Sequence, residues 1–138
     1  PDGRTAYLSD TRQQVIWRWA LDETGAPSGE REVHIDVTGT KINPDGAVCD
    51  AEGYLWNAQW GAWRVARYAP DGSEDRVIEV PVKQPTCPAF GGPDLTTLYI
   101  TSATENLSAE SLAKQPDAGK VLCLEAGVTG MPENRCVI

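Results

Sequence analysis

Residues 52–58, Glu-Gly-Tyr-Leu-Trp-Asn-Ala, open on a turn dipeptide and continue as a short strand of apolar and aromatic side chains. A polar turn near Gly61 follows, and then a second alternating strand over residues 64–68. The same pattern occurs at residues 2–19 and, with a longer insertion, at residues 93–124. One aromatic side chain of each unit stands at a matching position, 49 and 43 residues apart: Tyr7, Trp56 and Tyr99. Three such units indicate a repeat architecture.

Further strands are expected around each unit. Residues 31–37 and 76–82 alternate apolar and polar side chains, as half-exposed strands do. Two short runs without charge, residues 46–49 and 85–90, are expected to be buried inner strands. One segment, residues 106–114, has a helical composition and is expected to be a surface helix capped by an Asn or a Ser.

Short strands that recur at this interval are typical of an all-β fold, the β-propeller, with four-stranded blades. The blades are expected near residues 1–40, 41–83 and 84–138. A β-sandwich and a barrel also use many short strands and remain alternatives. Propellers close with about four to eight blades, so three blades are expected to be part of a ring or to close it by association. The first unit begins inside a turn and lacks its inner strand, which predicts that an N-terminal portion is absent from this chain.

Composition limits the classes of partner. The chain has 138 residues and a net charge of −8, which argues against binding to nucleic acid or to anionic membranes. No apolar run approaches the roughly 18 residues of a membrane-spanning helix, and no signal-peptide pattern is present. We therefore expect a cytoplasmic protein.

Most catalytic motifs are absent from the sequence. There is no nucleophile elbow, P-loop or dinucleotide-binding glycine motif, and the single histidine, His34, rules out a multi-histidine zinc site within this chain. His34 is expected to be a surface residue of an outer strand.

Carboxylates remain as groups for chemistry, because oxygen ligands suit divalent cations. A Pro-Asp-Gly triplet occurs three times, at Asp2, Asp45 and Asp71. Asp2 and Asp71 lie in links between expected strands and are interpreted as turn residues. Asp45 immediately precedes the expected inner strand at residues 46–49. Inner strands line the central channel of a propeller, so Asp45 is expected at the mouth of that channel, where a carboxylate can bind a cation or polarise a water. A functional role and a turn role both remain open for it.

The tryptophans are expected to pack mostly between blades, and a sugar-stacking role for Trp60 or Trp63 is the weaker alternative. Cys87 is a third weak candidate for substrate binding. The four cysteines have no metal-binding spacing and are expected to be small buried hydrophobic residues. One bridge, between Cys123 and Cys136, is left open.

The chain resembles the C-terminal half of the SMP-30/gluconolactonase family, also called regucalcin-like proteins. The resemblance covers essentially all 138 residues and rests on an ordered set of short motifs. These are residues 1–5 followed by 7–11, the Pro-Asp-Gly of residues 44–46 with 50–53 and 55–56, then 60–61, 64–65, 70–72, 85–87, 89–92 and 98–103.

The resemblance implies a six-bladed propeller with one divalent cation, Ca²⁺ or Zn²⁺ or alternatively Mn²⁺ or Mg²⁺, in the central channel. Of the three family ligands only the aspartate carries over, onto Asp45; the others lie upstream of Pro1. The implied reaction is hydrolysis of a sugar lactone, in which the cation polarises the ester carbonyl and Asp45 positions or deprotonates the water.

Two departures from the family pattern put the substrate in doubt: Ala62-Trp63 in place of small glycines, and Pro88 within an inner strand. The rival hypothesis is a non-enzymatic half-propeller that binds a small ligand or assembles with a second copy or with the absent N-terminal half.

Overall fold

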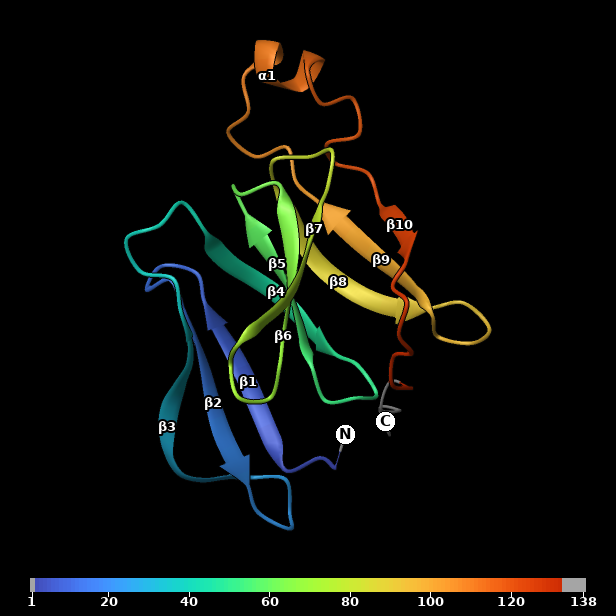
Figure 1. Ribbon diagram of the computed structural model, residues 1–138. Helices are drawn as coiled ribbons and strands as arrows, with labels where there is room; N and C mark the ends of the chain where they lie inside the picture. Colours follow the sequence, from blue (N-terminus) through green and yellow to red (C-terminus); the bar gives the residue numbers. More distant parts are fainter. Residues whose placement is uncertain (1, 133–138) are drawn as a thin grey trace.

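Ten strands and one short helix make up the part of the chain that the computed structural model describes, residues 2–132 (Figure 1). In chain order the elements are β1 (Thr5–Asp10), β2 (Val15–Leu21), β3 (Pro27–Asp36), β4 (Asn43–Cys49), β5 (Leu55–Trp60), β6 (Arg64–Tyr68), β7 (Glu74–Glu79), β8 (Pro85–Gly91), β9 (Thr97–Ser102), α1 (Ala109–Ala113) and β10 (Leu122–Glu125). Each expected strand is therefore confirmed, with ends shifted by a few residues.

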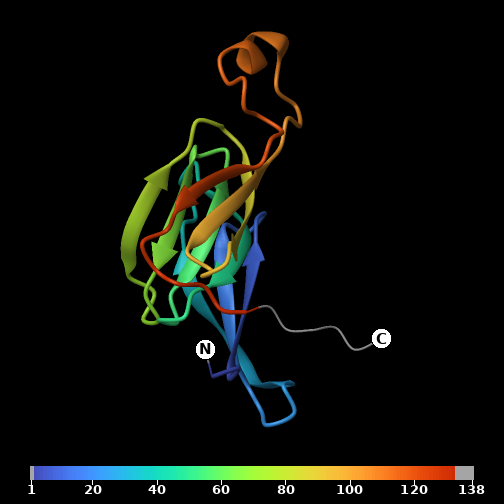
Figure 2. The same ribbon diagram turned by 90° about the vertical axis from the view of Figure 1, so that its right-hand side faces the viewer.

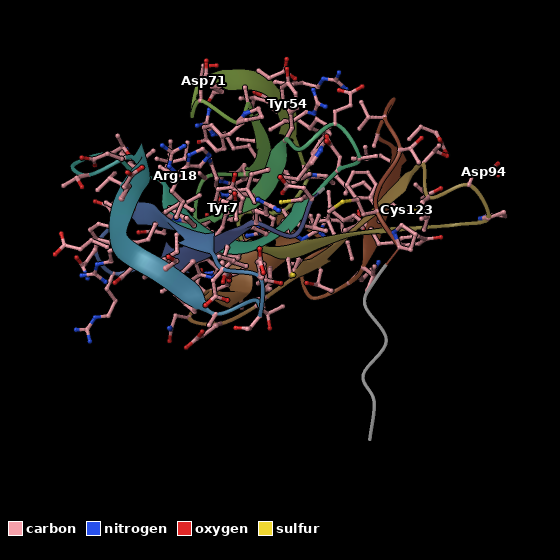
Figure 3. The ribbon with its side chains drawn as sticks, turned by 90° about the horizontal axis from the view of Figure 1, so that it is seen from below. Tyr7, Arg18, Tyr54, Asp71, Asp94 and Cys123 are labelled. Carbon is pink, nitrogen blue, oxygen red and sulfur yellow. The ribbon has the colours of Figure 1, made fainter. Side chains whose placement is uncertain are left out.

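The strands form three antiparallel sheets, which we call the first, second and third blades. Their strand orders are β1-β2-β3, β4-β5-β6-β7 and β10-β9-β8. Seen from below, the three blades fan out from one another (Figure 3). β4 contacts both β1 and β8, so the blades meet along these strands. Within the described residues only the second blade has the four strands expected of every blade.

Hydrophobic clusters join the blades pairwise. Ile16 and Ile35 of the first blade pack against Leu55, Ala66 and Tyr68 of the second. A second cluster joins the second blade to the third, with buried side chains at Trp56, Ala58, Val65, Val80, Val82, Phe90, Leu98, Ile100 and Ala126. The core of this molecule therefore lies between sheets, as sheet-on-sheet packing requires.

The repeated aromatic residue of each unit faces the blade that follows it in the chain. Tyr7 packs against the cluster shared with the second blade, and Trp56 packs edge-on to the ring of Phe90 in the third. Tyr99 occupies the same position on the third blade and is 41% exposed. The face of the third blade that bears Tyr99 is thus uncovered in this structure.

A buried ionic network fixes the second blade. Asp50, which directly follows β4, is fully buried and accepts hydrogen bonds from the Trp56 indole Nε1 and the Arg67 Nε, each at 2.9 Å. Its other oxygen accepts the backbone N–H groups of Glu52 and Tyr54. Every oxygen of this buried carboxylate therefore has a partner, which is the condition under which burying a charge is tolerated.

The insertion between β9 and β10 projects beyond the sheets (Figure 2). Its helix α1 begins after Ser108, whose hydroxyl accepts the Ser111 N–H, and this confirms the expected helix and one of its two candidate caps. Asn106, the alternative candidate for this cap, lies in the preceding turn and has a left-handed φ of 56°. No helix in residues 2–132 has the length and apolar composition that crossing a membrane would need.

The expectation of buried cysteines is wrong for two of them. Cys87 and Cys123 are exposed because they lie on the uncovered face of the third blade, and Cys49 is half-buried. Cys136, and with it the question of a bridge to Cys123, lies outside the described residues. Pro88 lies on β8, which is an edge strand of its sheet, the place where strands tolerate proline.

We predict that Asp50→Ala lowers the free energy of unfolding by about 3 kcal/mol, because the Trp56 N–H and the Arg67 Nε lose their buried acceptor. Glu52 and Asp75 still pair with the Arg67 charge in this variant. The measurement is a urea unfolding curve. The control is Glu110→Ala, which removes the exposed pair with Lys114 and should cost less than about 1 kcal/mol. Equal losses of unfolding free energy in the two variants would contradict the role of Asp50 as the buried carboxylate that holds the second blade together.

Candidate functional site

Asp45 lies within β4, not before it as the sequence predicts, because the strand already begins at Asn43. The β4–β5 register passes from Pro44 opposite Gln59 to Ala47 opposite Asn57. Two residues, Asp45 and Gly46, therefore face a single residue on β5, which is a β-bulge. Bulges re-aim a side chain out of the regular alternation, and Asp45 is one of the two residues of this bulge.

A cavity of about 280 Å³ opens beside Asp45, between the first and second blades. Three of the residues that line it come from β1 and three from β4. The cavity is therefore formed where the first and second blades meet. Its lining residues are Tyr7, Leu8, Ser9, Asp45, Gly46 and Ala47. Tyr7, labelled in Figure 3, lies near the middle of the fan.

Burial raises the pKa of the Asp45 carboxyl, and a hydrogen bond from the Gly46 N–H opposes this shift only in part. None of the ion pairs found among residues 2–132 includes Asp45. A half-buried carboxylate without a cationic partner is suited to bind a cation or to accept a proton. A functional role for Asp45 stays a prediction.

The other two Pro-Asp-Gly aspartates are confirmed as turn residues. The Asp71 carboxylate accepts the backbone N–H and the hydroxyl of Ser73, at 2.9 and 2.7 Å. The Asp2 carboxylate accepts the Arg4 N–H. These local hydrogen bonds lower the pKa of Asp71, opposite to the shift at Asp45.

Gly46 has no room for a side chain. A Cβ at this position would lie 2.6 Å from Cys87 Sγ and 2.8 Å from the Thr86 carbonyl oxygen. The third blade therefore presses against the bulge from the side opposite the first blade.

Tyr7, which lines the cavity, packs against the ring of His34, which does not line it. Tyr7 and His34 have ring centroids 4.9 Å apart, so His34 is half-buried against Tyr7 and not the plain surface residue expected. Burial lowers the pKa of His34, with a smaller contribution from Arg18 in the same direction. Burial likewise raises the pKa of the Tyr7 phenol, and Cys49 adds to it. Both groups are therefore uncharged near pH 7.

The three weak substrate candidates lie away from the lining of this cavity. Trp60 ends β5, and Trp63 is 39% exposed in the following turn, with a left-handed φ of 60°. Cys87 touches the bulge through Gly46 but is exposed on the third blade. Their proposed roles stay predictions.

Sequence reasoning missed two residues next to Asp45. Asn57, within an apolar strand, donates from Nδ2 to the Asp45 carbonyl oxygen at 2.9 Å. Ser9, on β1, shares the cavity lining and lies 3.3 Å from the same nitrogen. The polar residue type at position 57 between Trp56 and Ala58 is the signal that could have identified Asn57.

A divalent cation finds one suitable group here. Within the described residues no cluster of three or more His, Cys, Asp or Glu side chains is present. The half-buried Asp45 carboxylate fits a hard cation by its oxygen chemistry and its missing counter-charge. The described residues would thus offer a cation one carboxylate at this cavity, and Asp45 as a metal ligand stays a prediction.

Comparison with known proteins places this geometry in context. Residues 1–104 match the model of the SMP-30/Gluconolactonase/LRE-like region. The chain is 44% identical over 133 residues to the 6-deoxy-6-sulfogluconolactonase of Pseudomonas putida, covering 96% of this chain and 46% of that protein. It is 38% identical to the L-arabinolactonase of Azospirillum brasilense, over 98% of this chain and 44% of that protein.

Among solved structures, the chain resembles a calcium-binding protein, regucalcin, from Agrobacterium tumefaciens. The TM-score is 0.90 at 48% identity, over 95% of this chain and 45% of that chain. The three blades described above are therefore blades of a β-propeller. The chain spans a little under half the length of the relatives it matches.

We predict that Asp45→Asn stabilises the cation-free protein at pH 7. Because the folded-state pKa of Asp45 is raised, its ionisation disfavours folding, and stability is lost as the pH rises from the unfolded pKa, about 3.9, through the folded one. The gain in Tm, measured by calorimetry in EDTA, should therefore be present at pH 7 and vanish near pH 3. A gain that is equal at both values would contradict the assigned cause.

Proposed function

The chain belongs to the SMP-30/gluconolactonase/LRE-like family, and from that premise we propose that it supplies the Asp45-bearing part of a divalent-metal-dependent sugar lactonase. One observation carries the proposal: a half-buried carboxylate without an ion-pair partner lines a cavity where two blades meet. The lactonase names of the relatives support the substrate class.

Lactone hydrolysis adds the oxygen of a water molecule to the ester carbonyl carbon, breaks the ring carbon–oxygen bond and leaves a hydroxy acid. The water must lose a proton, and the ring oxygen must gain one. Asp45 is the group of this chain that would orient the water and accept its proton, a role for which a raised pKa is favourable.

A bound cation would act as a Lewis acid toward the ester carbonyl, and Asp45 would be one of its ligands. Calcium is the cation named for the Agrobacterium tumefaciens regucalcin, and Ca²⁺ is our first proposal, with Zn²⁺, Mn²⁺ and Mg²⁺ as alternatives. The remaining ligands are proposed to come from outside residues 2–132. A cytoplasmic location stays a prediction.

The test uses the protein expressed from its full gene, with glucono-1,5-lactone as the probe and release of acid as the readout. Asp45→Asn should lower kcat by about a hundredfold or more, since general-base catalysis contributes that much. Asp71→Asn is the matched control, because it removes the carboxylate of an identical triplet from a turn and should leave kcat unchanged. EDTA should abolish hydrolysis and Ca²⁺ restore it; an Asp45→Asn enzyme with wild-type kcat would overturn the proposal.

A second candidate function, assembly with a blade of another copy, is favoured by the outer faces of the end blades. Leu8 and Val33 on the first blade are 52% and 50% exposed, and Tyr99 on the third blade is 41% exposed. Tyr99 matches Tyr7 and Trp56, both of which pack against the next blade. The uncovered face of the third blade thus carries an aromatic side chain at the position where the first and second blades use one to pack against the next blade.

Light scattering of the 138-residue chain tests this candidate. Assembly predicts a mass near twice that of one chain, returned to a single mass by Tyr99→Glu. Lys114→Glu, on the exposed helix α1, is the control and should leave the assembly intact. A folded chain of single mass at high concentration would contradict assembly.

A further inference from the structure

Asn57 of β5 binds the bulge that carries Asp45. Its Nδ2 group donates to the Asp45 carbonyl oxygen at 2.9 Å and to the Gly46 carbonyl oxygen at 3.3 Å. These are the carbonyl groups of the two bulge residues, which the extra residue takes out of the regular ladder. One side-chain amide therefore supplies the donor that the β-bulge itself lacks.

The placement of Asn57 is costly for a residue that only fills the core. It is fully buried, and its Oδ1 has no hydrogen-bond partner in the part of the chain that the structure describes. An unpaired buried acceptor is destabilising, and an apolar side chain of similar volume would avoid it. The cost indicates that the donor half of the amide is needed where it is.

Gln59, two residues along the same strand and on the same side, provides a comparison. It is also fully buried, but both ends of its amide are satisfied: Nε2 donates to the Tyr68 hydroxyl at 2.7 Å, and Oε1 accepts from Arg64. None of these bonds reaches the bulge. Gln59 is thus a structural amide, and the difference at Asn57 lies in what it holds.

The bulge is held from two sides. Cys87 and Thr86 of the third blade press on Gly46 and leave no space for a Cβ. On the other side, Asn57 Nδ2 also lies 3.3 Å from Ser9 Oγ of the first blade, and Ser9 lines the same cavity as Asp45. Packing against Cys87 and Thr86 restricts the position of Gly46. The hydrogen bonds from Asn57 restrict the direction of the Asp45 and Gly46 carbonyl groups.

We propose that Asn57 is a positioning residue, which acts through the two bulge carbonyls to aim the Asp45 carboxylate into the cavity. The inference rests on the proposed role of Asp45 in lactone hydrolysis. The Gly46 N–H donates to the Asp45 carboxylate, so rotation of the Asp45–Gly46 peptide would remove the hydrogen bond that orients this carboxylate. Loss of Asn57 should therefore lower catalysis by more than its effect on stability accounts for.

The experiment compares Asn57→Leu with Gln59→Leu in the protein expressed from its full gene. Asn57→Leu should lower kcat for glucono-1,5-lactone about ten- to a hundredfold, the range for groups that support a ligand or reacting group. KM should change little, and Tm should fall no further than in Gln59→Leu, because each variant leaves two polar groups without a hydrogen-bond partner. Gln59→Leu should lower Tm because Tyr68 and Arg64 lose their partner, and it should leave kcat unchanged. In EDTA, the Gly46 amide resonance should shift in Asn57→Leu and not in Gln59→Leu.

Wild-type kcat in Asn57→Leu would overturn the inference, as would an unshifted Gly46 resonance. If Asn57→Leu does not fold, Asn57→Asp keeps the side-chain volume and replaces the donor by an oxygen, and the same loss of kcat is expected. Asp45→Asn separates the two proposals. Activity retained in Asp45→Asn defeats the proposed function, whereas activity lost there but retained in Asn57→Leu defeats only the role of Asn57.

Discussion

The buried pair of Asp50 and Arg67 is the interaction on which the rest of the structure depends. Asp50 stands where β4 ends, and its carboxylate reaches Trp56 on β5 and Arg67 on β6. Arg67 continues to Asp75 and Glu52, and its guanidinium lies 3.7 Å from the Tyr54 ring centroid. The backbone of Asp50 also forms an antiparallel β-bridge with Gly130. The charge pair thus links β4, β5 and β6 of the second blade, at a desolvation cost that its hydrogen bonds offset. The main-chain bridge at the same residue joins Gly130 to this blade.

Two carboxylates on or next to one strand, five residues apart, have opposite environments. Asp50 is fully buried and bonded at both oxygens, whereas Asp45 is half-buried beside a cavity and has no ion-pair partner in residues 2–132. Anchoring β4 at Asp50 holds one end of the strand, and Asn57 together with Cys87 holds the bulge. The fold thereby keeps a poorly solvated carboxylate at a fixed place. That arrangement costs stability, and under the proposed function it would provide the reactive carboxylate.

Much of the fold follows from the sequence, because alternation and turn residues act locally. The ten strands, the Ser108 cap and the structural roles of Asp2 and Asp71 are all predictable in this way. The extent of β4 is not, because Pro44 and Gly46 suggest a turn where long-range pairing with β5 enforces a bulge. The sequence shows Asn57 as a polar residue within an apolar strand, but its contacts cannot be predicted, because they go to two carbonyl groups that only the bulge exposes. Exposure of Cys87 and Cys123 depends on which face is covered, which local pattern does not report.

The central claim is that Asp45 is the carboxylate of this chain that binds the cation. Crystals of the protein expressed from its full gene, soaked in Mn²⁺, would test it through the anomalous signal of the metal. The account predicts a peak about 2.0–2.6 Å from an Asp45 carboxylate oxygen, the range of cation–oxygen bonds. A single strong peak whose coordination shell contains no oxygen of Asp45 would contradict it.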